Sequence, residues 1–355
     1  MLGFSGTREW VYPQAISGRF TTLRRWTFLA LHLILFVAPW IVVKGHPLLL
    51  IDIPARRVFL AGGVFTAADT FFLLLLLLFL TFALFFFTAL WGRLWCGYAC
   101  PQTVFLETWI RPLEIWIEGD RTRRKRRDGQ GWPFDRVWRK AAKWTAFLAV
   151  SFLLGMAIVS LFVPARELWT LQSGPVAYSF VGVFTFLWYW DFTWFREQFC
   201  NFLCPYARFQ SALTDDETLL IGYDPKRGEP RGGKEAATDG RCIACNKCVV
   251  VCPQGIDIRD GFQLECIQCA RCIDACVSVM DKLGHRTLVE YTSMAEQEGR
   301  TVRRFRPRTV IYAGLLASLV LFGGVLMAQR LPFEATVNRV PGSLFTVDPD
   351  GYVRN

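Results

Sequence analysis

From residue 242 the chain reads Cys242-Ile-Ala-Cys245-Asn-Lys-Cys248-Val-Val-Val-Cys252-Pro253, and after a spacer it reads Cys266-Ile-Gln-Cys269-Ala-Arg-Cys272-Ile-Asp-Ala-Cys276. The spacing Cys-x2-Cys-x2-Cys-x3-Cys therefore occurs twice. Three closely spaced thiolates can wrap one face of a 4Fe–4S cubane, and a distant fourth can close it. This pattern predicts a compact domain that folds around two such clusters.

The double pattern is that of bacterial ferredoxins, in which the fourth cysteine of each copy ligates the cluster of the other copy. We therefore assign Cys242, Cys245, Cys248 and Cys276 to one 4Fe–4S cluster, and Cys252, Cys266, Cys269 and Cys272 to the second. Zinc sites use pairs of ligands with a longer gap, so the triplets argue against zinc. The second copy departs from the motif, because Val277 follows its last cysteine where the first copy has Pro253.

The composition indicates a membrane protein, because 53% of the 355 residues are hydrophobic. Apolar runs long enough to cross the hydrocarbon core predict about five transmembrane helices, at residues 26–43, 70–90, 144–163, 176–195 and 309–329. The expected fold class is an α-helical membrane protein. It consists of two parallel helical hairpin repeats and one further helix, with an α+β ferredoxin-like domain that holds two clusters inserted before the last helix.

These runs also predict the domain boundaries. Residues 1–25 form a cytoplasmic N-terminus, 26–205 a four-helix membrane domain, 206–308 a cytoplasmic ferredoxin domain, 309–329 the fifth span, and 330–355 a periplasmic tail.

The distribution of basic residues predicts the orientation. Residues 91–143 contain 12 lysines and arginines, whereas residues 44–70 contain three and residues 164–175 contain one. Basic loops stay in the cytoplasm, so both the ferredoxin insert and residues 91–143 are expected on that side of a bacterial inner membrane. A reducing cytoplasm favours iron–sulfur ligation over disulfides. The net charge of +10 is explained by this asymmetry and does not indicate nucleic-acid binding.

The four remaining cysteines form an internal repeat. Each of the first two expected hairpins ends in Cys-x3-Cys-Pro, at Cys96 and Cys100 and again at Cys200 and Cys204. On a helix, this spacing puts two thiols on one face, one turn apart. The following prolines bias the second cysteine of each pair to a helix end. Parallel repeats related by an axis along the membrane normal would bring the four thiols together.

The chemistry of these four cysteines leaves several alternatives open. Thiolates are soft ligands that prefer Cu(I), so a thiolate site favours reduction of Cu(II). Four cysteines also suffice for a third iron–sulfur cluster. The remaining alternatives for these four cysteines are a redox-active dithiol and a structural role.

Other polar residues in the apolar runs are expected to be structural. His32 is one of only three histidines, so a haem with two axial ligands is not expected, and the side chain is interpreted as packed or hydrogen-bonded. Asp191 is expected to pair with Arg93 or Arg196, since ionisable groups at membrane depth need partners. The basic run at residues 121–127 is expected to fix topology and meet anionic lipid. No nucleotide-binding motif is present.

The order of the motifs resembles the CcoG/FixG/RdxA family of cytochrome c oxidase accessory proteins. The resemblance rests on Trp95-Cys96-Gly-Tyr-Ala-Cys100-Pro101-Gln102-Thr103, on Cys200-x3-Cys204-Pro205-Tyr206, and on the ferredoxin run with Gly255-Ile-Asp-Ile-Arg-Asp-Gly261 between its halves. It covers nearly the whole chain. A looser similarity extends to the NapH and NosR group of membrane polyferredoxins.

The resemblance implies a cytoplasmic cupric reductase that helps supply Cu(I) for assembly of a cbb-type haem–copper oxidase. By motif position, Cys96, Cys100, Cys200 and Cys204 would be the copper-associated residues. The implied partners are a copper chaperone or assembly factors of the oxidase. The electron donor would be a quinol or a cytoplasmic reductant.

Two further points bear on this interpretation. Residues 337–355 resemble the first strands of the periplasmic immunoglobulin-like domain that family members carry, and a docking role of that domain is not carried over. The alternative function is a quinol-oxidising relay subunit of the NapH/NosR type, which would pass electrons to a partner protein.

Overall fold

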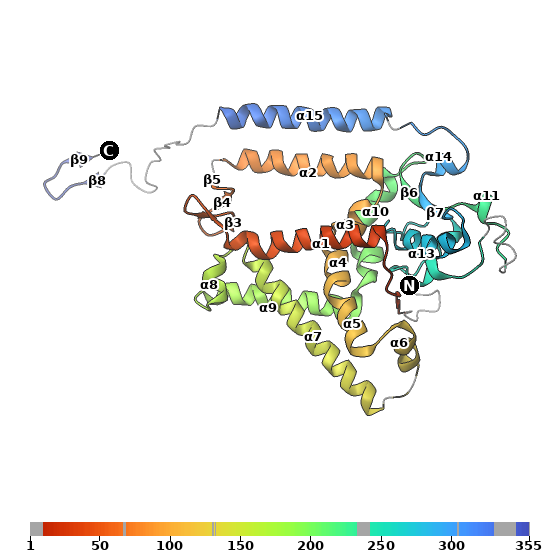
Figure 1. Ribbon diagram of the computed structural model, residues 1–355. Coiled ribbons are helices and arrows are strands. Elements are labelled where there is room, and N and C mark those ends of the chain that lie inside the picture. The colour runs from red at the N-terminus through yellow and green to blue at the C-terminus, as the bar shows by residue number, and fades with distance from the viewer. Residues whose placement is uncertain are drawn as a thin grey trace.

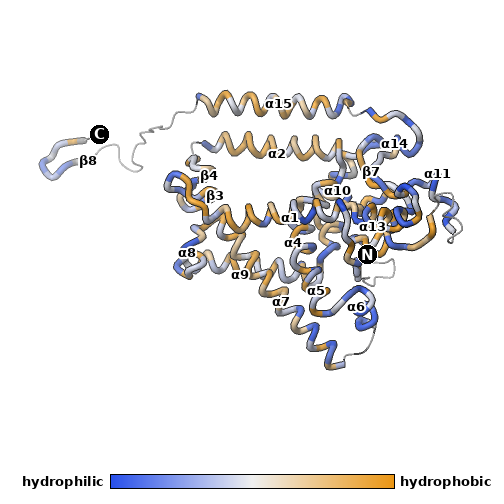
Figure 2. Tube along the Cα trace, viewed as in Figure 1, coloured by the Kyte–Doolittle hydropathy of each residue, from blue (hydrophilic) through white to orange (hydrophobic). Residues whose placement is uncertain are grey.

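A computed structural model describes residues 10–66, 69–129, 131, 133–232, 242–303, 305–329 and 346–354. Long helices run side by side through one half of the molecule, and the ferredoxin domain lies at one end of them (Figure 1). A small group of strands and a short helix lie at the opposite end. The apolar stretches of the long helices form a common band, with hydrophilic segments gathered beyond its ends (Figure 2).

Five long helices correspond to the five predicted spans. They are α1 (Arg19–Val37), α2 (Thr70–Trp91), α7 (Phe134–Val159), α9 (Pro175–Trp190) and α15 (Pro307–Ala328). In the described chain, four of them are long and apolar enough to cross a membrane, and α9 with its 16 residues is not among the four. The predicted span 176–195 is instead divided between α9 and a π-helical turn, η4 (Asp191–Phe195). The chain is thus a membrane protein by its helices, while the count of five spans stays a prediction.

The helices do not pack as two equivalent hairpins. The main helix neighbour of α7 is α9, as expected, but α2 lies along α15 (Figure 1). Phe71 meets Phe322 and Phe85 meets Tyr312 along this second pair, with ring centroids 6.2 Å and 6.1 Å apart. A separate core joins α1, α7 and the cysteine-bearing segment through fully buried side chains such as Phe147 and Phe192. The prediction of two parallel hairpin repeats is therefore not confirmed.

The first long helix begins at residue 19, seven residues before the predicted span. Its first turn is capped by Asp274 of the ferredoxin domain, whose carboxylate accepts hydrogen bonds from the Phe20 and Thr21 backbone N–H groups at 3.2 Å and 2.8 Å. The Thr21 hydroxyl adds a third at 2.7 Å. Because the capping group comes from a distant part of the chain, a local reading of the sequence does not find this start.

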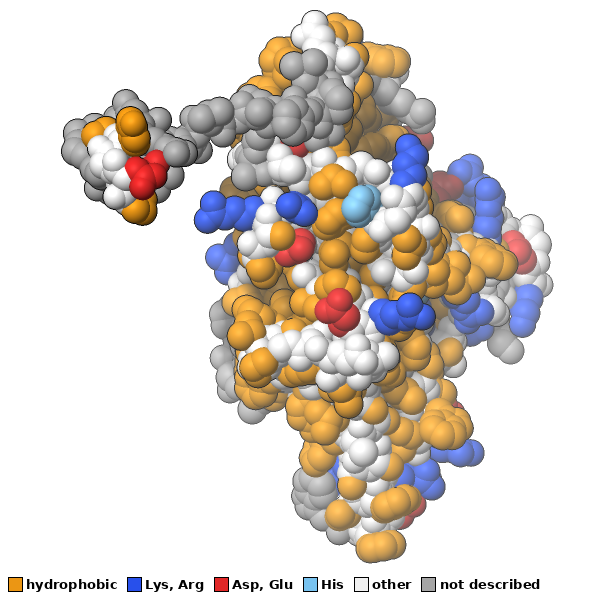
Figure 3. Space-filling model, turned by 90° about the vertical axis from the view of Figure 1, so that its left-hand side faces the viewer, with side chains coloured by type: hydrophobic (Ala, Val, Ile, Leu, Met, Phe, Trp, Pro, Cys, Tyr) orange, Lys and Arg blue, Asp and Glu red, His pale blue; other side chains and the backbone are white. Residues whose placement is uncertain are grey.

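The segment between α1 and α2 forms strands that the sequence interpretation missed. A turn, η1 (Ala38–Trp40), is followed by the pair β1 (Val42–Val43) and β2 (His46–Pro47) and by the antiparallel sheet β3 (Leu49–Asp52), β4 (Arg57–Leu60) and β5 (Gly63–Phe65). The short helix α8 (Ala165–Trp169) lies at the same end of the molecule. Figure 3 shows this end as mainly hydrophobic and uncharged surface with isolated charged side chains.

At the other end of the long helices, short helical segments carry the four remaining cysteines. These are α3 (Leu94–Tyr98), α4 (Pro101–Phe105), the π-helical turn η3 (Leu106–Ile110), α5 (Arg111–Glu118), α6 (Arg121–Asp128), the π-helical turn η5 (Phe199–Leu203) and α10 (Pro205–Leu213). Buried ion pairs join them. The basic run forms α6, and its Arg124 is 3% exposed and bonds Glu114 at 2.7 Å, so the expected contact with lipid is wrong for that residue.

The ferredoxin domain has the expected α+β character. Its strands β6 (Leu220–Tyr223) and β7 (Val289–Thr292) pair in antiparallel fashion. Around them lie α11 (Pro225–Gly228), α12 (Lys247–Val250), η7 (Ile258–Asp260), α13 (Arg271–Met280), η8 (Asp281–Leu283) and α14 (Met294–Gln297). The two strands and α13 enclose a hydrophobic core against which several cysteine side chains pack.

In the tail, the described residues form a short hairpin of β8 (Thr346–Val347) and β9 (Val353–Arg354). Residues 330–345 and 355 lie outside the described residues, so the expected beginning of an immunoglobulin-like domain stays a prediction.

Candidate functional site

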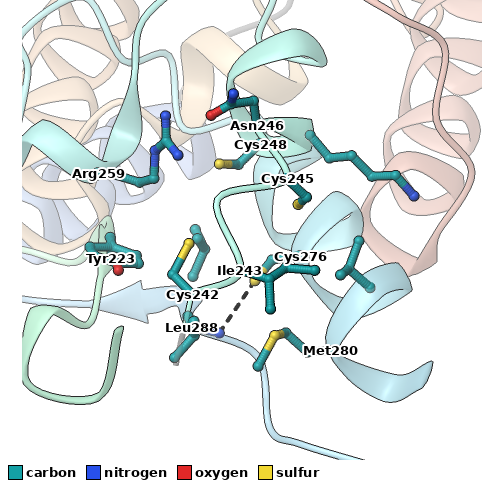
Figure 4. Close-up of a pocket in the computed structure, with 13 residues that line it drawn as sticks. Tyr223, Cys242, Ile243, Cys245, Asn246, Cys248, Arg259, Cys276, Met280 and Leu288 are labelled. Atoms are coloured by element: carbon teal, nitrogen blue, oxygen red, sulfur yellow. Dashed lines mark hydrogen bonds between the residues drawn. The ribbon is translucent and has the colours of Figure 1, made fainter. Parts of the chain in front are cut away.

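The first cysteine set lines one cavity of the ferredoxin domain. Cys242, Cys245, Cys248 and Cys276 all border it, although Cys276 belongs to the second copy of the motif (Figure 4). The backbone N–H of Leu288 points to the sulfur of Cys276 at 3.4 Å. The structure thus brings together the four residues that the sequence assigns to one cluster.

The second set is assembled from the other four cysteines. The pKa of Cys266 is raised to about 12, mainly by burial and in part by the nearby thiols of Cys269 and Cys252. Burial likewise raises the pKa of Cys272, with Cys269, Cys266 and Cys252 among its neighbours. Cys252 is thus a neighbour of the second triplet, and it does not border the cavity of the first set, in agreement with the exchange of fourth ligands in ferredoxins.

The backbone has the same unusual geometry in both copies. The residues on either side of the middle cysteine, Ala244 and Asn246 in one copy and Gln268 and Ala270 in the other, have φ values of 54°, 56°, 53° and 59°. Non-glycine residues seldom adopt positive φ, and such strain clusters where a ligand is held. Two such residues at matching positions curl each loop around the space that its three sulfurs face.

These observations fit a 4Fe–4S cluster in each set. Burial raises the pKa of Cys252, and it raises that of Cys248 in spite of the nearby Arg259, so these thiols keep their protons until iron binding replaces them. For Cys252, the backbone N–H groups of Gln254, Gly255 and Ile256 lower the pKa in opposition to burial. Backbone donors directed at sulfur are one of the means by which a protein sets a cluster's reduction potential.

The two Cys-x3-Cys-Pro motifs share their local backbone. Each begins four residues after a position with positive φ: Gly92 has φ 56° and ψ −126°, and Arg196 has φ 53° and ψ −124°. In both motifs the second cysteine donates its backbone N–H to the carbonyl five residues earlier at 2.9 Å. The second cysteine then caps a helix that starts on proline, as predicted. It lies at a helix end in each case, as the prolines predict, and not within the helical segment of the first cysteine.

The four membrane-proximal cysteines lie near one another. Burial raises the pKa of Cys96 to about 11, and Cys100 and Cys204 add to the shift. Burial also raises the pKa of Cys200, again with the other three thiols as contributors. Among the described residues, no three Cys, His, Asp or Glu side chains are close enough together to hold a single metal ion. The structure therefore gathers the four thiols in one region, without a closed coordination shell for one ion.

The first motif is in direct contact with the ferredoxin domain. Cys96 belongs to the same buried cluster as Ile267 and Cys269, and Tyr206 packs against it. A Cβ atom on Gly97 would lie 2.5 Å from the carbonyl oxygen of Ile267 and 3.0 Å from the backbone nitrogen of Cys269. Only glycine permits this approach, because no other residue lacks a Cβ. The loop of the second cysteine set thus lies against the peptide that follows Cys96.

Polar side chains around this contact hold it in place. The Gln210 amide lies 3.8 Å from the sulfur of Cys96, and Arg93 donates hydrogen bonds to Gln210 and to the carbonyl of Leu264. Arg24 donates a bond to the carbonyl of Gly97 at 2.8 Å. The sequence analysis did not identify either residue, because Gly97 is an unspecified position within the Cys-x3-Cys-Pro motif and Gln210 lies outside it.

His32 and Asp191 are the two polar residues of the apolar runs for which a structural role is expected. His32 is hydrogen-bonded on both ring nitrogens, to the carbonyl of Phe28 at 2.7 Å and from the indole of Trp109 at 2.8 Å, which confirms a structural role. Asp191 accepts a bond from the Gln102 side chain at 2.7 Å. Among the described residues no ion pair joins Asp191 to Arg93, which binds Gln210, or to Arg196, although Arg196 is a charged neighbour of Asp191.

Arg196, the other expected partner of Asp191, is bound elsewhere. Its guanidinium makes two 3.0 Å bonds to the carboxylate of Glu114. Burial alone would raise the pKa of Glu114, but Arg196 and Arg124 lower it to about 2. A carboxylate held between two buried arginines is the stronger partner, and it leaves Asp191 to an amide.

Comparison with known proteins identifies both cysteine regions. A family described as a 4Fe-4S dicluster domain matches residues 195–294, and one described as a 4Fe-4S binding domain matches residues 72–124. The second match contains Cys96 and Cys100. No solved structure matches the chain.

Curated relatives extend the comparison to nearly the full chain. Protein RdxA of Cereibacter sphaeroides is 40% identical over 97% of this chain and 77% of its own length. Protein RdxB of the same organism is 39% identical over 98% of this chain and 78% of its own length. The nitrogen fixation protein FixG of Rhizobium meliloti is 36% identical over 98% of this chain and 75% of its own length. Identity at this level places the chain in the CcoG/FixG/RdxA family, as the order of its cysteine motifs predicts, and makes it an iron–sulfur electron-transfer protein of a membrane.

Proposed function

We propose that this protein reduces Cu(II) to Cu(I) at Cys96, Cys100, Cys200 and Cys204, using electrons that arrive through the ferredoxin domain. The observation that carries the proposal is the contact between Gly97 and the loop of Cys269. It brings Cys96, one of the thiols that would receive copper, against Ile267 and Cys269 of the second cysteine set. When bound, 4Fe–4S clusters supply one-electron carriers, and reduction of Cu(II) to Cu(I) consumes one electron.

The chain's own residues support a copper substrate in two ways. Thiolates are soft ligands, so they stabilise Cu(I) relative to Cu(II), which prefers nitrogen and oxygen donors. The buried thiols also hold their protons in the absence of metal, since burial raises the pKa of Cys96 to about 11 and also raises that of Cys100. Copper binding would therefore release protons, and affinity for copper would increase with pH.

The cellular setting is part of the proposal. The basic residues of the segment 91–143 favour the cytoplasm, so the metal sites would face that side of an inner membrane crossed several times. Reduced copper would go to a copper chaperone or to assembly factors of a cbb-type oxidase, as the resemblance implies. A reporter that is active only in the periplasm should be silent when fused after Asp128 and active when fused after Gly342. The reverse pattern would place the cysteines outside the cytoplasm.

A relay function is the second candidate. The family that matches residues 72–124 is described as 4Fe-4S binding, and this stretch includes Cys96 and Cys100. The four membrane-proximal cysteines would then hold a third cluster and pass electrons from quinol to a partner protein.

Metal content separates the two functions. Two clusters predict about eight iron atoms per chain, and a third raises the number to about twelve. Replacing Cys96 and Cys200 together by serine should abolish Cu(II) reduction and leave about eight iron atoms, because the ferredoxin domain folds around its own ligands. Loss of iron along with copper binding would overturn the copper assignment and favour the relay.

A further inference from the structure

A cavity of about 910 Å³ runs along most of α1, from Thr21 beside the ferredoxin domain to Phe36 near the other end of the helix. It is bordered by α1, η3, α5, the first residue of α13 and the segment that precedes α1. The arginines of α1 that line it, Arg24 and Arg25, belong to the start of the helix, the end that points toward the ferredoxin domain in Figure 1. The cavity is distinct from both cysteine sets, because none of the twelve cysteines lines it.

One side of the cavity carries buried arginines with unused hydrogen-bond donors. Arg24, Arg111 and Arg271 are only 2%, 6% and 6% exposed. Within the described parts of the chain, no hydrogen-bond acceptor meets Arg24 Nη2, Arg111 Nη1 or Arg271 Nε, and the hydroxyl of Thr108 is also without a partner. Leaving buried polar groups unsatisfied is costly, so these atoms point to a ligand rich in acceptors.

The charged side chains that line the cavity also indicate a ligand rich in hydrogen-bond acceptors. Its charged lining consists of four arginines, which include the exposed Arg25, and a single carboxylate, Glu107. Glu107 is already bound by Arg271 at 2.7 Å and by Arg111 at 3.2 Å. Arg111 has a second carboxylate outside the lining, Glu197 at 3.7 Å, whereas no ion pair joins Arg24 or Arg25 to a described residue, so the lining keeps an excess of positive charge that favours an anion.

The other side of the cavity is apolar. Phe28, Leu29, Phe36, Trp109 and Ile115 line it, and three of these side chains belong to α1, a candidate membrane span. A free inorganic anion would leave this side without a partner. The ligand is therefore amphipathic, with an anionic head and a hydrocarbon body that enters from the bilayer.

We propose that this cavity binds an anionic phospholipid. Its phosphate would lie between Arg24, Arg111 and Arg271, with the exposed Arg25 attracting the head group at the edge of the cavity, and an acyl chain would follow the apolar side of α1. Phosphate offers several acceptor oxygens to guanidinium groups, which bind it with two donors at once. A neutral quinol matches the cavity less well, because its hydroxyl groups need acceptors and the single carboxylate is already paired.

The position of the lipid gives it a structural role between the two halves of the protein. Arg24 also holds the carbonyl of Gly97, and Arg111 donates a bond to the carbonyl of Pro253 at 3.3 Å, next to Cys252. Arg271 directly precedes Cys272. Phosphate bound to these arginines would link the membrane motif to the loops of the second cysteine set. This inference is independent of the copper proposal.

The test uses the full-length protein with its clusters, reconstituted in nanodiscs of phosphatidylcholine mixed with phosphatidylglycerol. Native mass spectrometry after release from the nanodiscs counts the lipid retained per protein. We expect one phosphatidylglycerol to be retained in preference to phosphatidylcholine. Retention should fall about tenfold in Arg25→Gln, whose side chain is exposed and whose loss does not endanger folding, and further in Arg24→Gln.

Arg19→Gln is the matched control, because Arg19 lies on the same helix, is exposed and does not line the cavity. It should retain lipid as the parent protein does. Equal retention of both lipids, or an unchanged lipid count in Arg25→Gln, would overturn the proposal. Displacement of the lipid by inorganic phosphate alone, or recovery of a bound quinone in its place, would overturn it as well.

Discussion

Replacing Gly97 by alanine probes the contact on which the proposed electron route depends. The added Cβ would lie 2.5 Å from the carbonyl oxygen of Ile267, whereas ordinary van der Waals contact begins at 3.4 Å. The loop of Cys269 must therefore retreat by at least 0.9 Å, the difference between these distances. Gly97 lies within α3 and has no positive φ, so alanine is not itself strained there.

The cost can be estimated from core substitutions. Inserting a methyl group into a well-packed site costs about 1–3 kcal/mol, because neighbouring side chains and backbone must shift. Against this, alanine gains about 1 kcal/mol over glycine in helix propensity. A penalty of 1–3 kcal/mol corresponds to a shift of about 5- to 150-fold in the equilibrium between the docked and separated arrangements.

The assay follows electron transfer and cluster content separately. The protein is reduced under anaerobic conditions, which bleaches the absorbance of its iron–sulfur clusters, and is then mixed with Cu(II). Recovery of that absorbance reports oxidation of the clusters. A chelator that binds Cu(I) reports the copper that has been reduced. We expect Gly97→Ala to keep its iron and to slow both signals, while hydrogen exchange rises at residues 264–269. Gly182→Ala is the matched control, because a Cβ there meets nothing within 4 Å. If Gly97→Ala transfers electrons at the parent rate with unchanged exchange, the contact does not carry the route.

Two further substitutions test the junction and the buried charges. Asp274→Ala removes all three bonds that cap the first turn of α1, and should cost about 1–2 kcal/mol of stability and increase hydrogen exchange near Thr21, as measured by mass spectrometry. Glu114→Gln leaves two buried arginines without their carboxylate and should lower the free energy of unfolding by about 3–5 kcal/mol, whereas Glu298→Gln, at an exposed pair with Arg300, should change it by less than about 1 kcal/mol. The pKa of Glu114 falls from 4.5 to about 2 on folding, so the stability that its carboxylate contributes is present above pH 4.5 and is lost as the pH drops toward 2. When the free energy of unfolding is measured at a series of pH values, this loss should appear in the parent protein and be absent in Glu114→Gln.

The cysteine spacing predicted the composition of the first cluster set because ligand spacing constrains the local backbone. Cys242, Cys245 and Cys248 curl around one space since each must face it, and Cys276 joins them through the fold of the domain. The helix start at residue 19 was missed for the opposite reason. Its capping carboxylate, Asp274, is more than 250 residues away, and no local pattern encodes it.

The packing partners of the apolar helices could not be predicted from the sequence either. The run of leucine and phenylalanine in α2 is apolar on every side, so periodicity does not say which face meets a neighbour. Its neighbour is α15, from the far end of the chain. The strands of residues 42–65 escaped notice because each is only two to four residues long, too short for alternation to be read.

The two Cys-x3-Cys-Pro motifs follow residues with the same positive φ, Gly92 and Arg196, but these two residues have different neighbours. Gly92 has the Gln268 side chain 2.7 Å and the carbonyl of Leu219 3.0 Å from where a Cβ would lie, so a side chain is excluded on the face toward the ferredoxin domain. Arg196 adopts the same strained conformation with a full side chain, because its guanidinium reaches the buried carboxylate of Glu114. Strain of this kind persists only where surrounding contacts outweigh it. The first motif is thus specialised for contact with the electron-carrying domain and the second for anchorage in the buried charge network, so exchanging the two residues would disrupt both functions at once.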